Sequence, residues 1–399
     1  VCKASYDGRI ANSNPTATTF YLGWSGWYGF SQTLMDEVKV YDYVMSNEEI
    51  NIEYTKLNPR TNQSCTFYKP PSKGPVKINC SGLYVDDKEF KIKGVGYQPI
   101  PIGRTAESLS HKQLMYNDVR IRDRDFPILR RMGANTIRVW SEMMNKSFMD
   151  ELYNGGVAPI YVLMGFWIQC EEDYSKESIR ESYKNKFRAY VEEYKDHPSV
   201  LAWMIGNENN LGYCSGSNLI DDYNSLANEL AEIAYEIEGE NYHPIGIVNG
   251  DLGGIGDEFY FGDDASLNYT DFWGINTYRG KSFGNLFSEY EYLTGRPMII
   301  TEYGVDVLNN TDNSEIEDVQ SEWVLALWDE IDISSVALGG TIMAYSDEWW
   351  KGDVFGNCGD RFTHDYSCGH GDFPTPDGWS NEEWFGIVRI KKNPIPGGE

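Results

Sequence analysis

The sequence of 399 residues has few basic residues and no long apolar run. Its 34 lysines and arginines face 61 aspartates and glutamates, which gives a formal charge of −27. Nucleic acids and anionic membrane surfaces are unfavourable partners for such a chain. No stretch reaches the roughly 18–20 consecutive apolar residues that a membrane-spanning helix needs, and the first residues lack the basic start and apolar run of a signal peptide. We therefore expect no membrane span and no nucleic-acid binding.

Metal-binding patterns are also missing. The five histidines are scattered, no C-x-x-C pair occurs, and the acidic stretch GDEFYFGDD lacks the spacing of an EF-hand. His364 and His370 share a loop with Asp365 and Cys368, for which a disulfide-bonded lid is favoured over a metal site. The sequence predicts neither a metal nor a cofactor.

The cysteines favour disulfide bonds, because seven are present without any metal-binding spacing. Their positions suggest three pairings: Cys65 with Cys80, Cys170 with Cys214, and Cys358 with Cys368. Cys2 is left over. An odd cysteine in a secreted protein implies a partner elsewhere, so we expect self-assembly or a covalent partner through Cys2, on another chain or on an absent part of a precursor.

Five N-x-S/T sequences, none with proline in the middle, are candidate sites for N-glycosylation. They begin at Asn62, Asn79, Asn145, Asn268 and Asn309. Together with the cysteines and the acidic charge, they favour a secreted or cell-surface glycoprotein whose signal peptide has been removed.

The first part of the chain predicts a small β unit. Aromatic and polar residues alternate between residues 11 and 54, in TTFYLGW and DEVKVYDYV, which is typical of half-buried strands. The ending resembles the last strands of a laminin-G-like or concanavalin-like jelly roll. We expect residues 1–56 to be the carboxyl-terminal part of such a β-sandwich domain, in a chain that begins inside a longer precursor. Residues 57–75, rich in Pro, Ser and Asn, read as a linker.

The remaining residues, 76–395, predict a (β/α)8 barrel of the α/β class. After a hairpin that turns at Asp86 and Asp87, short apolar runs alternate with amphipathic stretches such as DDYNSLANELAEIAYEIEG. Eight runs are present: IKGVGYQ, ANTIRVW, PIYVLMGFW, VLAWMIGNE, HPIGIVNGD, FWGINTY, PMIITEY and GGTIMAYSDE. Eight strands over about 300 residues fit a TIM barrel. A doubly wound sheet is the alternative.

Polar residues end several of these runs, where the active site of a barrel lies. They are Arg138 in the second run, Asn207 and Glu208 in the fourth, Asn276 and Tyr278 in the sixth, Glu302 and Tyr303 in the seventh, and Tyr345, Asp347 and Glu348 in the eighth. Burying a carboxylate at the end of a strand costs free energy, which calls for a functional reason or a partner. Paired carboxylates cleave glycosidic bonds, so Glu208 and Glu302 predict a glycosidase. The alternative is two surface or helix-capping glutamates.

Two of these motifs carry a specific resemblance. WMIGNENN and PMIITEYG resemble the acid/base and nucleophile motifs of retaining glycosidases of clan A. With IKGVGYQP, DFPILRRMGANTIRVW, WGINTY and GGTIMAYSDE, the chain from about Phe90 to Trp350 resembles the fungal β-1,3-glucanosyltransferases. The resemblance implies that Glu208 is the general acid/base and Glu302 the nucleophile.

The same resemblance implies roles for neighbouring residues. Asn207 would hold the sugar 2-hydroxyl, Tyr278 would hydrogen-bond the nucleophile, and Arg138 would lie beneath Glu302 and keep it ionised. Gln98 and Tyr345 would line the donor subsite. Trp349 and Trp350 are candidate platforms for sugar rings, and core packing is the alternative for them.

The expected function is therefore a retaining glycosidase or transglycosylase that acts on extracellular β-glucan, with β-1,3-glucan as the expected substrate. The long excursion after the eighth run, DEWWKGDVFGNCGDRFTHDYSCGHGDFPTPDGWSNEEWFGIV, has no counterpart that we can match in the fungal family. Plain hydrolysis by a glucanase or mannanase-like enzyme of the same clan thus remains open. A different class of function, a structural or adhesive surface glycoprotein that uses the barrel as a scaffold, is the alternative.

Overall fold

The computed structural model describes residues 65–389, apart from the gaps 81, 107, 109–114, 143–144, 171, 212–219, 352–360, 367–368 and 372. The chain divides into two compact units, Val1–Thr61 and Asn62–Glu399. In the first unit two short antiparallel strands are described, β1 (Trp24–Ser25) and β2 (Gly29–Phe30). The predicted jelly-roll remnant otherwise lies outside the described residues, as do Cys2 and Asn62.

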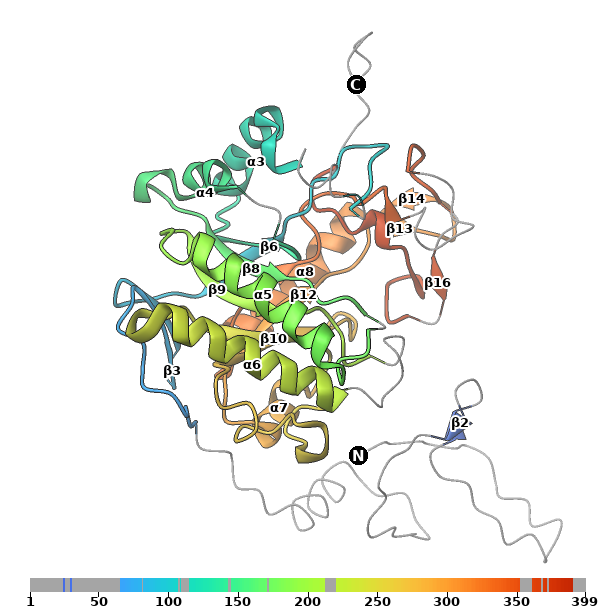
Figure 1. The fold of residues 1–399 in the computed structure, drawn as a ribbon. Coiled ribbons are helices and arrows are strands. Elements are labelled where there is room, and N and C mark those ends of the chain that lie inside the picture. The colour runs from blue at the N-terminus through green and yellow to red at the C-terminus, as the bar shows by residue number, and fades with distance from the viewer. Residues whose placement is uncertain are drawn as a thin grey trace, which may run out of the picture. The chain divides into compact units, whose positions relative to one another are not determined.

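The second unit is built on a closed barrel of eight parallel strands (Figure 1). In spatial order the strands are β6 (Ile92–Gly96), β7 (Thr136–Arg138), β8 (Tyr161–Phe166), β9 (Val200–Ile205), β10 (Ile245–Gly250), β11 (Phe272–Asn276), β12 (Met298–Tyr303) and β15 (Ala337–Ile342), which pairs again with β6. Seven of the strands lie within a predicted apolar run, and β15 begins two residues before the eighth run at Gly339. The prediction of a (β/α)8 barrel is therefore confirmed.

The strands read as unbroken apolar runs because both of their faces are buried. In β8, Leu163 belongs to the cluster inside the barrel, whereas Val162 and Met164 belong to the cluster beneath the helices. The same division by alternate residues holds in β9, where Met204 points inward and Trp203 outward. Parallel sheets covered on both sides have this composition, which distinguishes them from half-exposed strands.

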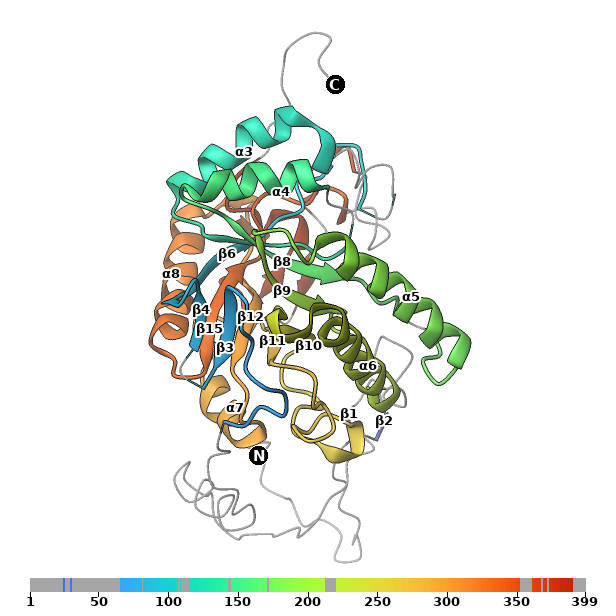
Figure 2. The same ribbon diagram turned by 60° about the vertical axis from the view of Figure 1, so that its left-hand side comes forward.

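Helices surround the strands, and α5 and α6 lie side by side in both views (Figures 1 and 2). The helices are α3 (Val119–Arg131), α4 (Lys146–Tyr153), α5 (Glu177–Tyr194), α6 (Ile220–Glu238), α7 (Leu286–Leu293) and α8 (Glu317–Ile333), with short 3-10 turns η1 (Asn154–Gly156), η3 (Gly239–Asn241) and η4 (Glu258–Tyr260). Helix α5 buries Tyr183, Phe187, Tyr190, Val191 and Tyr194, at the three- to four-residue spacing of one helix face. Between β10 and β11 the turn η4 is described where the repeat would place a helix.

A three-stranded antiparallel sheet closes the amino-terminal end of the barrel. It consists of β3 (Val76–Asn79), β4 (Gly82–Val85) and β5 (Lys88–Glu89). The two-residue turn between β4 and β5 is the predicted one at Asp86 and Asp87, whose φ angles of 50° and 61° fit a type I′ turn. Apolar side chains of β3 and β4 pack against the barrel interior. Substrate must therefore enter at the opposite end.

Residues 65–75, here called the strap, lie against this closed end. The ammonium group of Lys69 is 2.7 Å from the Asp271 carboxylate, and both side chains are 3% exposed. The Ser72 hydroxyl donates to the Tyr242 carbonyl at 2.6 Å. Polar side chains therefore attach the strap to the barrel without any apolar periodicity, and the linker bounds 57–75 stay a prediction.

Residues 361–389, here called the rim segment, pack at the carboxyl end of the barrel. The segment contains β16 (His370–Gly371), β17 (Trp379–Ser380) and the 3-10 turn η5 (Glu382–Trp384). Trp384 packs on the loop after β12, which forms the hairpin of β13 (Leu308–Asn309) and β14 (Ser314–Glu315). Within the described residues, no helix has the length and hydropathy required to cross a membrane.

Candidate active site

The predicted site residues meet at the carboxyl ends of four strands. Arg138 is the last residue of β7, Asn207 and Glu208 follow β9, Tyr278 follows β11, and Glu302 is near the end of β12. In a parallel barrel these ends lie on one side, so residues far apart in sequence become neighbours.

The carboxylate of Glu302 is held by three donors. Its Oε1 accepts from Arg138 at 2.6 Å and from the Trp140 indole at 3.0 Å, and its Oε2 accepts from the Tyr278 hydroxyl at 2.8 Å. Glu302 is only 8% exposed. Three donors, one of them a buried guanidinium, hold the carboxylate in one orientation. The contacts that were expected from Arg138 and Tyr278 are both present.

Arg138 distributes its charge over several acceptors at the site. Besides Glu302, its guanidinium donates to the Thr301 carbonyl at 2.9 Å and to the Asn207 side-chain oxygen at 2.6 Å. Its guanidinium carbon also lies 4.7 Å from the centre of the Trp140 ring. A buried arginine costs free energy unless its donors are used, and here oxygens at the strand ends accept from both Nη1 and Nη2.

Asn276, the last residue of β11, links the two glutamates. Its Nδ2 donates to Glu208 Oε1 at 3.0 Å and to Asn207 Oδ1 at 3.1 Å. Its Oδ1 accepts from Arg138 at 3.2 Å and from the Thr301 hydroxyl at 2.7 Å. We identified Asn276 as the end of a run but assigned it no role. Its position at a strand end was the available signal.

Trp140 was also assigned no role at the carboxylate. Its indole N–H donates to Glu302 Oε1 at 3.0 Å. It follows β7 by two residues, on the same side as Arg138, and the missed signal was again its position after a strand end.

The turn after β9 presents Glu208 through an unusual backbone conformation. Gly206 has φ 67° and Glu208 has φ 58°, a region that side chains other than glycine seldom occupy. A Cβ atom at position 206 would lie 2.0 Å from the Tyr223 hydroxyl, so only glycine fits. The Glu208 N–H donates to the Val248 carbonyl at 3.0 Å. Positive φ values concentrate at functional sites, and this turn directs Glu208 into the mouth of the barrel.

The Tyr278 hydroxyl remains protonated at neutral pH. Burial, together with the charge of Glu302, raises the pKa of Tyr278 well above its usual value. A protonated phenol acts as a hydrogen-bond donor, which matches its contact with the nucleophile candidate.

A cluster of charged side chains lies after β15, beside the residues that surround Glu302. The Lys351 ammonium lies 3.0 Å from Glu348 and 2.6 Å from Glu382. Burial raises the pKa of Glu348, and Lys351 opposes this rise. Burial also raises the pKa of the neighbouring Asp347 to about 7.

The rim segment forms one wall of the mouth. The Phe385 ring contacts the Tyr278 ring edge-on, with 5.7 Å between the ring centres. The Ala344 N–H donates to the Phe385 carbonyl at 3.0 Å, and the Val388 N–H donates to the Tyr345 carbonyl at 2.9 Å. A segment that was unmatched in the sequence resemblance therefore contacts a residue that binds Glu302.

Tyr345 is not placed as expected for a donor-subsite residue. Its side chain is fully buried, and its hydroxyl donates to Asp125 of α3 at 3.0 Å. The Tyr97 hydroxyl donates to the other oxygen of Asp125, also at 3.0 Å. Tyr345 thus belongs to a buried network that connects β6, β15 and α3, where it has no exposed surface for a sugar.

The other predicted platform residues are half-buried. Trp349 stacks on His364 with 4.7 Å between ring centres, and His364 stacks in turn on Trp384 at 3.4 Å. Trp350 packs against the main core. Gln98 is half-buried just after β6, and its side chain forms no hydrogen bond with the described residues. Substrate contacts for Gln98, Trp349 and Trp350 remain predictions.

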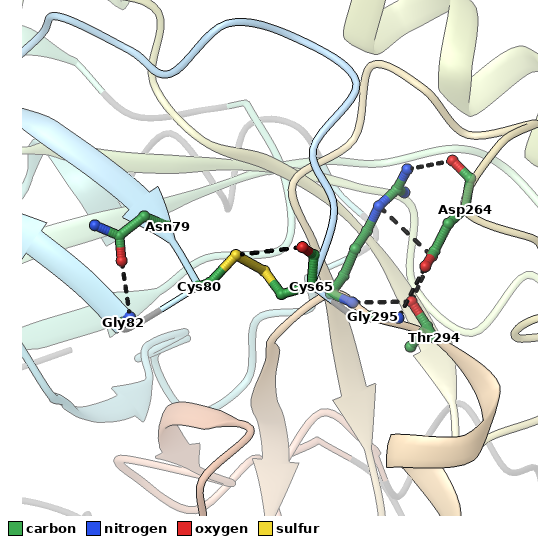
Figure 3. Close-up of a disulfide and its surroundings, with 8 residues drawn as sticks. Cys65, Asn79, Cys80, Gly82, Asp264, Thr294 and Gly295 are labelled. Atoms are coloured by element: carbon green, nitrogen blue, oxygen red, sulfur yellow. Dashed lines mark hydrogen bonds and ion pairs between the residues drawn. A yellow bond between two sulfur atoms is a disulfide. The ribbon is translucent and has the colours of Figure 1, made fainter. Parts of the chain in front are cut away.

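The Cys65–Cys80 disulfide is present, with Cα atoms 5.6 Å apart, and it fastens the strap to the end of β3 (Figure 3). Cys170 is also disulfide-bonded. Cys214, Cys358 and Cys368 lie outside the described residues. Within the described part, no cluster of three or more His, Cys, Asp or Glu side chains is arranged to hold a metal ion.

Four of the glycosylation candidates are described. The side chains of Asn79, Asn268 and Asn309 accept hydrogen bonds through Oδ1, from Gly82, Asn228 and Thr311 respectively. Asn145 is the N-cap of α4: its Oδ1 accepts from Phe148, and its Nδ2 donates to Asn117. At Asn145 the nitrogen that would carry a glycan is therefore already engaged.

Comparisons with known proteins agree with this geometry. A family model described as glucanosyltransferase matches residues 72–354. The 1,3-beta-glucanosyltransferase gas5 of Schizosaccharomyces pombe is 25% identical over 292 residues, which cover 68% of this chain and 54% of that protein. The 1,3-beta-glucanosyltransferase gel1 of Aspergillus fumigatus is 24% identical over 292 residues, covering 69% and 59%. The chain thus spans about half the length of the curated relatives that it matches.

Solved structures with the same fold are bacterial glycosidases. A β-glucuronidase from Bacteroides uniformis superimposes with a TM-score of 0.51 at 16% identity, covering 77% of this chain and 34% of that one. A β-glucuronidase from an uncultured Clostridium gives a TM-score of 0.51 at 18% identity, covering 69% and 47%. At these identities the likeness concerns the fold.

Proposed function

Since the chain belongs to the glucanosyltransferase family, we propose that it is a retaining glycosidase or transglycosylase that acts on β-glucan, with β-1,3-glucan as the substrate. The observation that carries the proposal is the triple hydrogen bonding of the Glu302 carboxylate by Arg138, Trp140 and Tyr278. A carboxylate that is fixed in one orientation by three donors suits a nucleophile.

The proposed first step forms a covalent intermediate. Glu208 donates its proton to the glycosidic oxygen as the bond between that oxygen and the anomeric carbon breaks. Glu302 attacks the anomeric carbon, which yields a glycosyl ester and releases the shortened chain with a new hydroxyl group. The environments of the two glutamates differ, because Arg138 binds Glu302 whereas an amide, Asn276, donates to Glu208. This difference supports the division of roles.

The second step reverses these roles. Ionised Glu208 takes a proton from an acceptor hydroxyl, whose oxygen attacks the anomeric carbon and displaces Glu302. A sugar hydroxyl as acceptor gives transfer, and water gives hydrolysis. Asn207 offers its amide nitrogen to the sugar, because its oxygen already accepts from Arg138 and Asn276. This orientation supports the role expected for Asn207 at the 2-hydroxyl.

The test is product analysis by mass spectrometry after incubation with defined β-1,3-gluco-oligosaccharides. Products longer than the substrate indicate transfer, and only shorter products indicate hydrolysis. The variant Glu302→Gln should lose activity by several orders of magnitude, because the amide cannot act as the nucleophile. An unchanged circular dichroism spectrum controls for folding. Substantial residual turnover by a folded Glu302→Gln variant would contradict the assignment of Glu302 as the nucleophile.

We further propose a secreted or cell-surface location. The Cys65–Cys80 bond supports an oxidising compartment, and Asn79 and Asn268 are exposed sequon residues. Figure 3 shows the Asn79 amide nitrogen pointing away from Gly82. Enzymatic deglycosylation of the purified protein should lower its mass, and an unchanged mass would contradict glycosylation. We also propose that Cys2 forms a disulfide bond with a partner.

A further inference from the structure

The rim segment begins beyond the residues that the family model matches, which end at 354, yet it is attached to several loops of the barrel mouth. After β6, the Gly103 N–H donates to the Arg361 carbonyl at 2.8 Å. After β12, the Asn310 N–H donates to Asp377 at 2.6 Å. Figure 1 shows β16 on the same side of the barrel as β13 and β14. This segment is therefore a fixed part of the mouth that the family pattern does not include.

Trp379 of β17 presents an aromatic surface from this segment. A Cβ atom placed on Gly371 of the paired strand would lie 3.6, 3.7 and 3.8 Å from three atoms of the indole, as expected when the ring covers the glycine. Gly369 lies under the other end of the same side chain. With glycines beneath one face, Trp379 remains 46% exposed.

The backbone that carries Trp379 is well anchored. The Trp379 N–H donates to Asp377 at 2.9 Å, and its carbonyl accepts from the Thr375 hydroxyl at 2.6 Å. Two residues later, the Asn381 N–H donates to the buried Asp306 at 2.8 Å. An exposed indole on such a support is held in place before any ligand binds, which reduces the entropy lost on binding.

A short path joins this indole to the catalytic centre. Phe385, six residues further along the chain, contacts Tyr278, which donates to Glu302. Six residues span at most about 20 Å, so Trp379 lies within the reach of a chain of several sugar units bound at the glutamates.

We propose that Trp379 is a remote sugar-binding subsite for the β-glucan chain, on the mouth of the barrel outside the reacting centre. The C–H face of a pyranose ring is apolar and packs on an aromatic face, while its hydroxyls stay in water. The exposed indole of Trp379 offers such an aromatic face beside the proposed active site. The formal charge of −27 disfavours anionic glycans and is compatible with a neutral glucan. This inference rests on the proposed function.

The test compares substrate lengths. Trp379→Ala should raise KM for long β-1,3-gluco-oligosaccharides by about threefold to tenfold, with unchanged KM for the shortest substrates and unchanged kcat. Trp379→Phe should restore most of the affinity, because it keeps a flat ring. Tyr68→Ala is the matched control, since Tyr68 is an exposed aromatic of the strap at the opposite end of the barrel. Equal KM values for wild type and Trp379→Ala on long substrates, or an equal rise at every length, would overturn the subsite.

A binding measurement separates this inference from the proposed function. Migration is compared in native gels that contain soluble β-1,3-glucan, another neutral β-glucan or an α-glucan. The subsite is supported if a β-glucan retards the wild-type protein and Tyr68→Ala equally but retards Trp379→Ala less. This result would support the subsite even if the protein does not turn over β-1,3-glucan and the proposed activity fails. Retardation that is the same in both variants, or absent in every β-glucan gel, contradicts it.

Discussion

Asn276 couples Glu208 and Glu302, the two glutamates that we propose as acid/base and nucleophile. One amide donates to Glu208, and its oxygen accepts from Arg138, which binds Glu302. Shared partners thus set the positions of Glu208 and Glu302. A substitution at either glutamate therefore affects the position of the other through the Asn276 amide. The arrangement explains why a neutral residue occupies the end of β11.

Tyr278 provides the first prediction at the residue scale. Tyr278→Phe removes one donor from the Glu302 carboxylate, and a hydrogen bond to a charged group stabilises by about 1.5–3 kcal/mol. We expect kcat to fall by about tenfold to a hundredfold, with a small change in KM. Steady-state kinetics on a β-1,3-gluco-oligosaccharide measure both constants.

The pH profile is a second readout for the same variant. Since burial holds the pKa of Tyr278 well above its usual value, Tyr278 stays protonated across the working range. The alkaline limb of the kcat profile should therefore lie at the same pH in wild type and variant. Its disappearance in Tyr278→Phe would mean that the phenol itself titrates, against this account.

Sequence reasoning singled out the charged residues of the site but missed two of their neutral partners, Asn276 and Trp140. Arg138, Glu208 and Glu302 were recognisable because charges at the ends of apolar runs need a reason. Asn276 and Trp140 have equally close contacts, but their roles depend on neighbouring strands that no local pattern reveals. Tyr345 was misplaced for a related reason, because its partner Asp125 lies 220 residues away on another element.

At the scale of elements, the barrel strands were predictable and the irregular segments were not. Each strand is buried on both faces, so it appears as an apolar run with helical periodicity on either side. The strap and the rim segment have no such period, because buried ion pairs and single hydrogen bonds hold them. Their attachment depends on distant residues such as Asp271 and Asp306.

Asp306, in the loop after β12, makes the attachment of the rim segment sensitive to pH. It is buried, and burial raises its pKa to about 7, above the usual value of 3.8. A raised folded-state pKa means that its stabilising contribution is complete below about pH 4 and is lost as the pH rises through 7. At roughly 1.4 kcal/mol per unit of pKa, the loss is of the order of a few kcal/mol.

Asp306→Asn should therefore reduce the fall in melting temperature between pH 5 and pH 8. Part of the fall will remain, because burial also raises the pKa of Asp347 to about 7. Asp312→Asn, an exposed position in the neighbouring hairpin, is the control and should not reduce the fall. If the melting temperature falls equally between pH 5 and pH 8 in wild type and in Asp306→Asn, this role is contradicted.

At the scale of the whole molecule, the sheet of β3, β4 and β5 closes one end of the barrel, the strap lies against that end, and the rim segment bounds the other end. Lys69 and Asp271 form a buried ion pair at the closed end, and Asp271 also accepts from the Ile245 N–H at 2.9 Å. Removing one partner of a buried pair leaves an uncompensated charge. The closed end is thus a place where one substitution affects the stability of the entire unit.

Lys69→Met should lower the free energy of unfolding by about 3–5 kcal/mol. The control is Lys73→Met, in the same strap, because Lys73 pairs with Glu240 at the surface and such pairs contribute about 0–1 kcal/mol. Urea denaturation followed by fluorescence measures both. Similar losses in the two variants would show that the burial of the Lys69 pair does not matter.

The pairing of Val388 with Ser346, next to the contact of Phe385 with Ala344, also bears on how the protein is made. During translation, Glu208 and Glu302 are synthesised long before the residues that pack on Tyr278. A nascent chain therefore contains Glu302 before the wall beside it is complete, and the mouth is finished only when residue 388 has emerged.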